Sequence, residues 1–467
     1  MCGILGVTLP ASMGDYEAAR LSFFGLFALQ HRGQEGAGLA TADGTGARIH
    51  KDTGLVTQLL TEQRLSSLPG HHAIAHTRYS TTGSSVARNA QPFLVETQHG
   101  PLGMVHNGNL VNAAELRDEL LAKGFPLAAT SDTEVMVMML ASAGGSSLED
   151  RVERTMPSWK GAYSLVILAS DRVVAVRDPW GFRPLSIGRL PDGGWAVASE
   201  TSALSTLRCS SVREVEPGEI VTMMGDDMSS RTALFGAPSL ARCTFEHVYF
   251  SRPDSVWDGT SVHHVRQRLG ELLAEDAPVD ADVVVPVPDS SIPAAIGYSQ
   301  RSGIPFNDGF IKNRYIGRTF IEPTQAMREH GVAMKFNVLR ENLEGRRVIM
   351  IDDSIVRGTT AGPLVRMLRE GGATEVHVRV TCPPIIHPCH MGLDMGTYDE
   401  LISHRLDVDA LRSFIGADSL AFLSLPSMMK AIGRSDGYCN ACFTGDYPLA
   451  VPVTIGRSKN NFEGVLR

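Results

Sequence analysis

Apolar residues recur along the chain with two different spacings, which predict both helices and strands. Apolar side chains repeat at helical intervals near the start, at Ala18, Leu21, Leu26 and Leu29. Later stretches have the short, β-rich composition of strands, and they cover residues 162–170, 172–178, 195–200 and 218–223. The first half is therefore expected to combine helices with a series of strands.

Helix-start signals place two more helices in the first half. Residues 105–124 read as a strand, a tight Asn-Gly turn and a helix that begins at Asn112. A further helix is expected to begin at Ser131, with Glu134 at the spacing of a capping box.

The second half has the pattern of a parallel α/β sheet. An apolar strand at residues 348–351 is followed by a Ser/Gly/Thr-rich loop, a helix closed by a Gly-Gly pair, and another strand. This order is a βαβ unit, whose strands run parallel. The stretch VVVPVPDSS, residues 283–291, ends a second strand before an apolar helix.

Length and composition indicate a two-domain globular protein. The chain has 467 residues, 43% of them hydrophobic, and a net charge of -8. One core does not organise so many residues, so we predict domains at 2–235 and 236–467. No basic block suggests nucleic-acid binding, and no apolar stretch has the length of a membrane span. Without a signal peptide the expected location is cytoplasmic, where the seven cysteines stay reduced.

Cys2 is the first candidate for catalysis. Removal of Met1 would leave an α-amine beside the thiol, and this amine can act as the base for its own side chain. An early cysteine in a strand is the plain alternative, so the prediction depends on what accompanies it.

Four further residues suit a substrate with an α-carboxylate, an α-amine and a side-chain amide. Arg78 can hold the carboxylate, Asp132 can hold the ammonium, and Asn107 with the Gly108 N–H can form an oxyanion hole. Taken singly, Arg78 could belong to a surface ion pair, Asp132 could simply begin a helix, and Asn107 with Gly108 could form a turn. Their occurrence together with Cys2 favours the catalytic interpretation.

The motifs CGI, HRGQEGAG, TRYSTTG, HNGN and SDTE resemble the class II, N-terminal-nucleophile glutamine amidotransferases in type and order. The resemblance covers about residues 2–235. It implies an αββα sandwich that hydrolyses glutamine to glutamate and ammonia through a Cys2 thioester. It also implies that groups near Arg32 and Gly33 shape the glutamine pocket.

Two adjacent carboxylates mark the second site. Asp352 and Asp353 end the strand at 348–351, where ligands of parallel sheets bind, and they can bind magnesium or ribose hydroxyls. The loop at 354–360 can turn N–H groups and hydroxyls toward a phosphate. The alternative is an acidic loop that only caps a helix.

This stretch resembles the phosphoribosyl pyrophosphate (PRPP) motif of the type I phosphoribosyltransferases. The resemblance implies a PRPP site formed by Asp352, Asp353, Ser354, Ile355, Val356, Arg357, Gly358, Thr359 and Thr360, with Asp289, Ser290 and Lys312. It implies one Mg²⁺ per subunit near Ser290, Asp352 and Asp353. Residues 309–337 carry several cations and are expected to form a lid over pyrophosphate, although a solvated basic loop is the alternative.

Together the halves resemble the glutamine PRPP amidotransferases. The resemblance implies that PRPP, glutamine and water give 5-phosphoribosylamine, glutamate and pyrophosphate, the first committed step of purine synthesis. It also implies a homotetramer with feedback inhibition by purine nucleotides. We weighed an amidotransferase with another acceptor, a PRPP-sensing regulator and a scaffold. The sequence has no ATP-binding loop that an amidotransferase with another acceptor would use. A PRPP-sensing regulator would leave Cys2 and the other glutamine-site residues without a role. No feature of the sequence favours a scaffold.

The remaining cysteines suggest a metal centre. Cys439 and Cys442 form a C-x-x-C, which on its own also fits a redox pair or half of a zinc site. Cys243 and Cys389 could complete four thiolates for zinc or an iron–sulfur cluster, and the family resemblance implies one [4Fe–4S] cluster per subunit. We expect a structural cluster, because the reaction transfers no electrons. Of the other residues that could bind a metal, Cys209 and Cys382 are taken as buried filler, and His387 and His390 are less favoured ligands.

Family members with a cluster often carry a propeptide before the catalytic cysteine. Only Met1 precedes Cys2 here, so methionine removal alone is expected to mature the chain.

Overall fold

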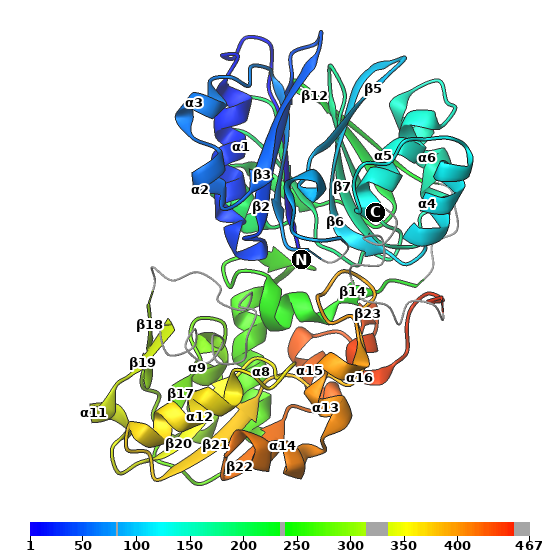
Figure 1. The fold of residues 1–467 in the computed structure, drawn as a ribbon. Coiled ribbons are helices and arrows are strands. Elements are labelled where there is room, and N and C mark those ends of the chain that lie inside the picture. The colour runs from blue at the N-terminus through cyan, green and yellow to red at the C-terminus, as the bar shows by residue number, and fades with distance from the viewer. Residues whose placement is uncertain (81–82, 234–238, 314–334, 453–467) are drawn as a thin grey trace.

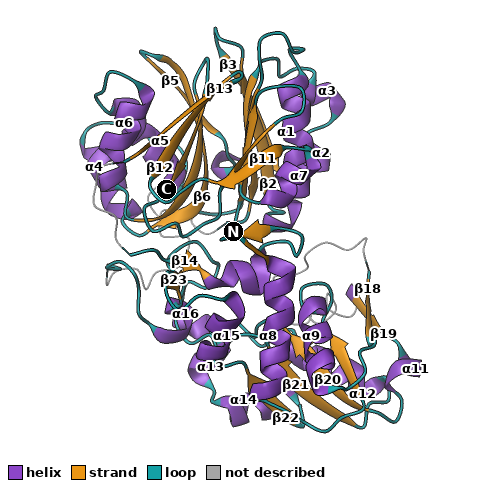
Figure 2. Cartoon of the chain, turned by 180° about the vertical axis from the view of Figure 1, so that it is seen from behind, coloured by secondary structure: helices purple, strands orange, loops and turns teal. Residues whose placement is uncertain are grey.

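The chain forms two bodies joined end to end, as the computed structural model shows (Figure 1). The structure describes residues 1–80, 83–233, 239–313 and 335–452. The first body holds the N-terminal strands and the second holds the parallel sheet, with the N-terminus at the junction between them (Figures 1 and 2).

Two antiparallel sheets face each other in the first body. The seven-stranded sheet has the order β11-β9-β10-β1-β4-β2-β3, and the six-stranded sheet has the order β13-β12-β8-β7-β6-β5. The first sheet consists of β1 (Gly3–Thr8), β2 (Gly36–Ala42), β3 (Ala47–Thr53), β4 (His72–Arg78), β9 (Ser186–Arg189), β10 (Trp195–Ala198) and β11 (Ser210–Glu214). The second consists of β5 (Phe93–Thr97), β6 (Gly100–Leu110), β7 (Gly161–Leu168), β8 (Val173–Arg177), β12 (Glu219–Met224) and β13 (Asp227–Thr232).

Helices cover the outer face of each sheet (Figure 1). The seven-stranded sheet is covered by α1 (Glu17–Ala28), α2 (Val56–Leu59), α3 (Glu62–Leu65) and α7 (Thr201–Thr206), and the six-stranded sheet by α4 (Ala113–Ala122), α5 (Asp132–Ser142) and α6 (Leu148–Thr155). An apolar cluster that includes Ile4, Val105 and Val166 fills the space between the sheets, and separate clusters lie under the helices. The predicted αββα sandwich is confirmed.

The second body is built on a four-stranded parallel sheet of order β17-β20-β21-β22. Its strands are β17 (Val283–Pro286), β20 (Arg347–Asp352), β21 (Glu375–Val380) and β22 (Ser419–Phe422). Helices lie on both faces (Figures 1 and 2), and they are α8 (Val262–Asp276), α9 (Ile292–Ser302), α12 (Ala361–Glu370), α14 (Val408–Ile415) and α15 (Leu425–Ile432). Val, Ile and Leu side chains of the strands are fully buried, which is typical of a sheet covered on both faces. The predicted α/β fold is confirmed.

Shorter elements complete the chain. The strand pairs are β14 (Arg242–Cys243) with β23 (Tyr438–Cys439), β15 (Val256–Trp257) with β16 (Thr260–Ser261), and β18 (Phe310–Lys312) with β19 (Phe336–Val338). The short helices are α11 (Arg340–Leu343), α13 (Ile402–Arg405), α16 (Ala441–Thr444), a π-helical turn at Glu246–Phe250, and 3₁₀ turns at Gln30–Arg32, Ala87–Asn89, Met156–Ser158 and Tyr398–Glu400. The domain boundary near residue 235 stays a prediction, although β13 is the last strand of the first body before β14.

Two local predictions need correction. β6 continues without interruption through Asn107 and Gly108, so the predicted Asn-Gly turn is wrong. The reason is that both residues lie opposite residues of β7, so the chain continues as a strand of the sheet instead of reversing. Asn112 does precede α4, but its side chain bonds Lys160 and Ser158 instead of capping the helix.

Within the described ranges, every helix is too short or too polar to cross a lipid bilayer.

Candidate active site

Cys2 lies immediately before β1, and its side chain is enclosed with a residue exposure of 8%. Its backbone nitrogen donates to Asn107 Oδ1 at 3.2 Å, and its Sγ donates to the Tyr79 carbonyl at 3.4 Å. Met1 is 1% exposed and belongs to the apolar cluster of the second body. The fold thus brings Cys2 and Asn107 together, although they are 105 positions apart in the sequence.

Asn107 has an unsatisfied donor beside this thiol. Its Oδ1 is engaged by Cys2, and within the described part of the chain its buried Nδ2 has no hydrogen-bond partner. A buried N–H without a partner is costly unless a ligand uses it. Gly108 follows in the same strand, and a Cβ there would lie 2.0 Å from the Ala162 carbonyl oxygen. Only glycine fits this position of β6.

Arg78 ends β4 and is buried. Its guanidinium donates to the carbonyls of Gly83 and Ser84, each at 3.2 Å, and to that of Asn89. These bonds fix the direction of the side chain from three sides. The structure therefore orients Arg78 through the segment that follows it.

Asp132 is the first residue of α5 and is buried. Burial alone would raise the pKa of its carboxyl, but His106, at 3.6 Å, and the backbone N–H of Leu110 hold that pKa below its usual value. Asp132 is thus a carboxylate at neutral pH. Sequence reasoning missed His106, although it stands in the same HNGN motif as Asn107.

Gly33 and Arg32 lie behind the nucleophile. A Cβ on Gly33 would come within 2.5 Å of the Arg78 backbone, so glycine is required for this close approach. Arg32 is fully buried, and its Nε donates to the Cys2 carbonyl at 2.9 Å. Its other nitrogens bind Glu200 and Glu246. The guanidinium is therefore committed to protein partners, which differs from a role in lining the glutamine pocket.

The second candidate site lies at the carboxyl end of β20, where Asp352 and Asp353 are both buried. Burial raises the pKa of both carboxyls, and for Asp352 the neighbouring Asp353 adds to the effect. Ser290 Oγ donates to Asp353 Oδ2 at 2.5 Å, which joins the loop after β17 to this pair. Arg266 and Lys335 offset only part of the repulsion. Two crowded carboxylates fit the oxygen ligands that a divalent cation such as Mg²⁺ prefers.

The loop between β20 and α12 wraps around this end of the sheet. Ser354 Oγ bonds Asp353, and Val356 accepts from the Ile402 N–H. Gly358 has φ +70°, and a Cβ there would approach Ile402 at 2.9 Å. The remaining predicted loop residues are the buried Ile355 and the half-buried Arg357, Thr359 and Thr360.

The predicted lid lies largely outside the described residues. Of its two ends, Lys312 in β18 forms an ion pair with Asp289, and Lys335 precedes β19 and acts on Asp352. Both ends thus face the predicted PRPP site. Residues 314–334 are not described, so closure stays a prediction.

A polar bridge connects the two candidate sites. Arg357 donates to the Asp394 carbonyl at 3.1 Å, and the Tyr79 hydroxyl lies 3.5 Å from Asp394 Oδ2. The Tyr79 carbonyl in turn faces the Cys2 thiol. Sequence reasoning missed both Tyr79 and Asp394.

The four predicted ligand cysteines approach one another at the junction of the bodies. Cys243 and Cys439 are paired residues of β14 and β23. Burial raises the pKa of Cys243 to about 11 and that of Cys439 to about 12, and Cys389 adds to both shifts. Burial also raises the pKa of Cys442, with the other three thiols contributing. In the described ranges, no three His, Cys, Asp or Glu side chains are placed to hold a single metal ion.

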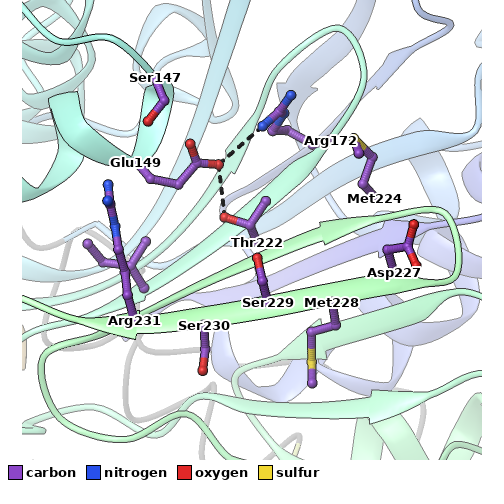
Figure 3. Close-up of a pocket in the computed structure, with 11 residues that line it drawn as sticks. Ser147, Glu149, Arg172, Thr222, Met224, Asp227, Met228, Ser229, Ser230 and Arg231 are labelled. Carbon is purple, nitrogen blue, oxygen red and sulfur yellow. Dashed lines mark hydrogen bonds and ion pairs between the residues drawn. The ribbon is translucent and has the colours of Figure 1, made fainter.

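A polar hollow lies elsewhere on the first body, along β12 and β13 (Figure 3). Glu149 accepts from Thr222 at 2.9 Å and from Arg172 at 3.4 Å within it. Glu149 is thus paired within the hollow, and none of the predicted catalytic residues lines it.

The comparisons with known proteins first define the class. A family of glutamine amidotransferase domains matches residues 76–206. Two solved structures match almost the whole chain at 45% identity. One is the glutamine PRPP amidotransferase of B. subtilis complexed with ADP and GMP, with a TM-score of 0.89 over 97% of this chain and 98% of that chain. The other, described as the allosteric regulatory enzyme of purine biosynthesis, has a TM-score of 0.91 over 98% of each.

Curated relatives then define the family. The amidophosphoribosyltransferase of Synechococcus elongatus is 47% identical over 99% of this chain and 94% of its own length. That of Bacillus subtilis is 46% identical over 96% and 94%, and that of Mycobacterium tuberculosis is 45% identical over 100% and 89%. This chain therefore belongs to the amidophosphoribosyltransferase family, which confirms the resemblance inferred from its motifs.

Proposed function

We propose that the chain transfers the amide nitrogen of glutamine to PRPP, with Cys2 and the Asp352–Asp353 pair as the centres of its two sites. Glutamine, PRPP and water give 5-phosphoribosylamine, glutamate and pyrophosphate, at the entry to purine synthesis. The observation that carries the first site is the buried Asn107 Nδ2, which has no hydrogen-bond partner in the part of the chain that the structure describes, while Asn107 Oδ1 accepts from the Cys2 N–H.

The first reaction is acyl transfer to Cys2. The thiol attacks the side-chain amide carbon of glutamine, and the α-amine freed by removal of Met1 takes its proton. Asn107 Nδ2 and the Gly108 N–H stabilise the oxyanion of the tetrahedral intermediate. The amine returns the proton as ammonia leaves, and water then hydrolyses the thioester to glutamate.

Two side chains hold the ends of glutamine. Arg78 binds the α-carboxylate, since its orientation is fixed by three carbonyls. Asp132 binds the α-ammonium, since His106 keeps it ionised. Fixing both ends places the amide carbon against the thiol, which replaces a collision by a positioned reaction.

The second reaction takes place at the end of β20. Ammonia attacks C1 of PRPP, pyrophosphate leaves, and the added nitrogen loses one proton. Asp352 and Asp353 hold the ribose hydroxyls, the loop at 354–360 binds the 5-phosphate, and Lys312 with Asp289 and Ser290 faces the pyrophosphate. A Mg²⁺ ion held by Ser290, Asp352 and Asp353 would neutralise charge on the leaving pyrophosphate.

The four cysteines at the junction of the bodies are proposed to bind one [4Fe–4S] cluster. In support, all four thiols are free of disulfides, and besides burial, Cys243, Cys389 and Cys439 together raise the pKa of Cys442. Thiolates are the soft ligands by which proteins hold such a cluster. The cluster would tie β14 and β23 to the loop at Cys389.

Regulation and assembly follow the relatives. The B. subtilis structure is a complex with ADP and GMP, and the second neighbour is described as allosteric. We therefore propose that purine nucleotides inhibit this chain. The family resemblance of its motifs is our ground for proposing a cytoplasmic homotetramer.

The test of the proposed function is a product balance. Purified protein is supplied with glutamine, PRPP and Mg²⁺, and glutamate and pyrophosphate are measured together. Equal amounts are expected, and adding PRPP should raise the rate of glutamine hydrolysis. Glutamate formation without pyrophosphate would refute the PRPP site, and pyrophosphate formation only with added ammonia would refute the glutamine site.

A further inference from the structure

Four charged side chains are buried between the two bodies, and we call them the buried charge network: Arg32, Arg183, Glu200 and Glu246. Arg32, Arg183 and Glu200 belong to the first body, whereas Glu246 lies in the π-helical turn that follows β14. Glu246 contacts both arginines. Its carboxylate accepts from Arg32 at 2.8 and 3.1 Å, and it lies 3.6 Å from the Arg183 guanidinium.

Stability alone does not account for this network. Removing charges from water is costly, and a buried ion pair is on balance often no more stabilising than apolar packing. The Nε donors of the two arginines point to another role, because they bind the backbone carbonyls of Cys2 and Met391, in and near the glutamine site.

One arm of the network reaches the nucleophile. Arg32 uses two nitrogens on Glu246, which leaves Nε aimed at the Cys2 carbonyl at 2.9 Å. Because the carbonyl belongs to the same residue as the thiol and the α-amine, this bond limits rotation of the whole nucleophile. Glu200 also bonds Arg32, but its second oxygen is taken by Ser255 and the Arg252 N–H.

The other arm reaches the oxyanion strand. Arg183 Nε donates to the Met391 carbonyl at 3.0 Å. The next residue, Gly392, lies so close to Gly108 that a Cβ on it would be 3.0 Å from the Gly108 carbonyl group. The His390 carbonyl accepts from Asn109 Nδ2 at 3.0 Å. The loop at 390–392 thus packs directly against β6, the strand that carries the oxyanion donors.

We propose that Glu246, a residue of the second body, is a positioning residue for the glutamine site of the first. It fixes Arg32 against the Cys2 carbonyl and Arg183 against the loop that supports Gly108. Through these two arms it sets the distance between the nucleophile and the oxyanion hole. The inference rests on the proposed function of Cys2 and Asn107, but Glu246 itself touches neither substrate.

The test compares E246Q and E246D with the unaltered chain. E246Q keeps the shape and removes the charge, whereas E246D keeps the charge and withdraws it by one methylene. Misplacing a catalytic group by about 1 Å can cost about 100-fold, so E246Q should lower kcat for glutamine hydrolysis by about that factor. KM for glutamine should change by less than about 3-fold, because Arg78 and Asp132 are untouched. Synthesis from PRPP and free ammonia should persist.

The kcat of E246D for glutamine hydrolysis is expected to lie between those of E246Q and the unaltered chain, since the carboxylate remains. The matched control is E219Q, which removes another buried carboxylate paired with an arginine, Arg213, away from Cys2. It should leave the ratio of the glutamine and ammonia activities unchanged.

Three results would overturn the inference. They are an unchanged kcat for glutamine in E246Q, an equal loss of the glutamine and ammonia activities, and an unfolded E246Q accompanied by a fully active E246D. The last two would show that Glu246 serves only the fold. If the unaltered chain itself hydrolyses no glutamine, the proposed function fails instead.

Discussion

At the scale of single residues, the Asp352–Asp353 pair suits the binding of a cation but lowers the stability of the fold. Burial raises the pKa of both carboxyls, and repulsion from Asp353 raises that of Asp352 further. An acid with a raised pKa costs the fold stability at neutral pH, and this cost fades as the pH falls. A site that awaits a cation is expected to carry such a cost.

We predict that D352N stabilises the protein in the absence of Mg²⁺ and PRPP while it abolishes synthesis from both nitrogen donors. Each kcal/mol of added stability should raise Tm by about 2–4 °C for domains of this size. The gain over the unaltered chain should shrink as the pH is lowered. Thermal unfolding followed over a series of pH values from neutral downward measures it.

D282N provides a control of opposite sign. Asp282 lies just before β17, and its bonds to Arg347 lower its pKa to about 2. Its charge is therefore favourable in the folded protein, and removing it should not raise Tm. A rise in Tm for both variants, or for neither, would contradict the assignment of repulsion to Asp352.

At the scale of elements, β6 carries the oxyanion donors because it continues where a turn was expected. We predict that G108A lowers the stability of the first body by about 1–3 kcal/mol, the usual cost of overpacking, because the added Cβ meets the Ala162 carbonyl at 2.0 Å. Glutamine hydrolysis should fall as the strand shifts, and ammonia-dependent synthesis should remain. The control G46A has no atom within 4 Å of the new Cβ and should be neutral. Equal unfolding transitions for the two variants would refute the steric argument.

Elements could be predicted from the sequence wherever one local signal decided the structure. The structure confirms β20, α12 and β21, which were predicted from the apolar run at 348–351, the loop after it and the Gly-Gly pair that ends the helix. The Asn-Gly signal failed because pairing with β7 overrode it. Ser131 caps α5 as expected, yet Glu134 does not complete the capping box. Its carboxylate accepts from the N–H groups of Ala128 and Ala129 instead.

At the scale of the whole molecule, the charges between the bodies could not be predicted. The catalytic candidates stand in contiguous motifs, so the sequence revealed them. Glu246 stands outside those motifs, and only the packing of the second body on the first brings it to Arg32 and Arg183. Charged residues are also usually exposed, so no pattern marks these as buried.

The cluster belongs to this scale because it would join distant segments. We predict about four iron and about four acid-labile sulfide per chain in protein purified without oxygen. C439S should lower the iron content and the yield of soluble protein, because ligand binding is coupled to folding. C209S should change neither, since Cys209 lies apart from the four thiols. A colourless, fully active protein with one zinc per chain would contradict the cluster.

The central claim is that two separable sites share one chain, and C2A tests it most directly. Product formation is measured with PRPP and Mg²⁺, once with glutamine and once with ammonium at a pH that supplies free ammonia. We predict that C2A loses glutamine-dependent synthesis completely and keeps most of its ammonia-dependent synthesis. Equal loss of both activities, or survival of the glutamine-dependent one, would contradict it.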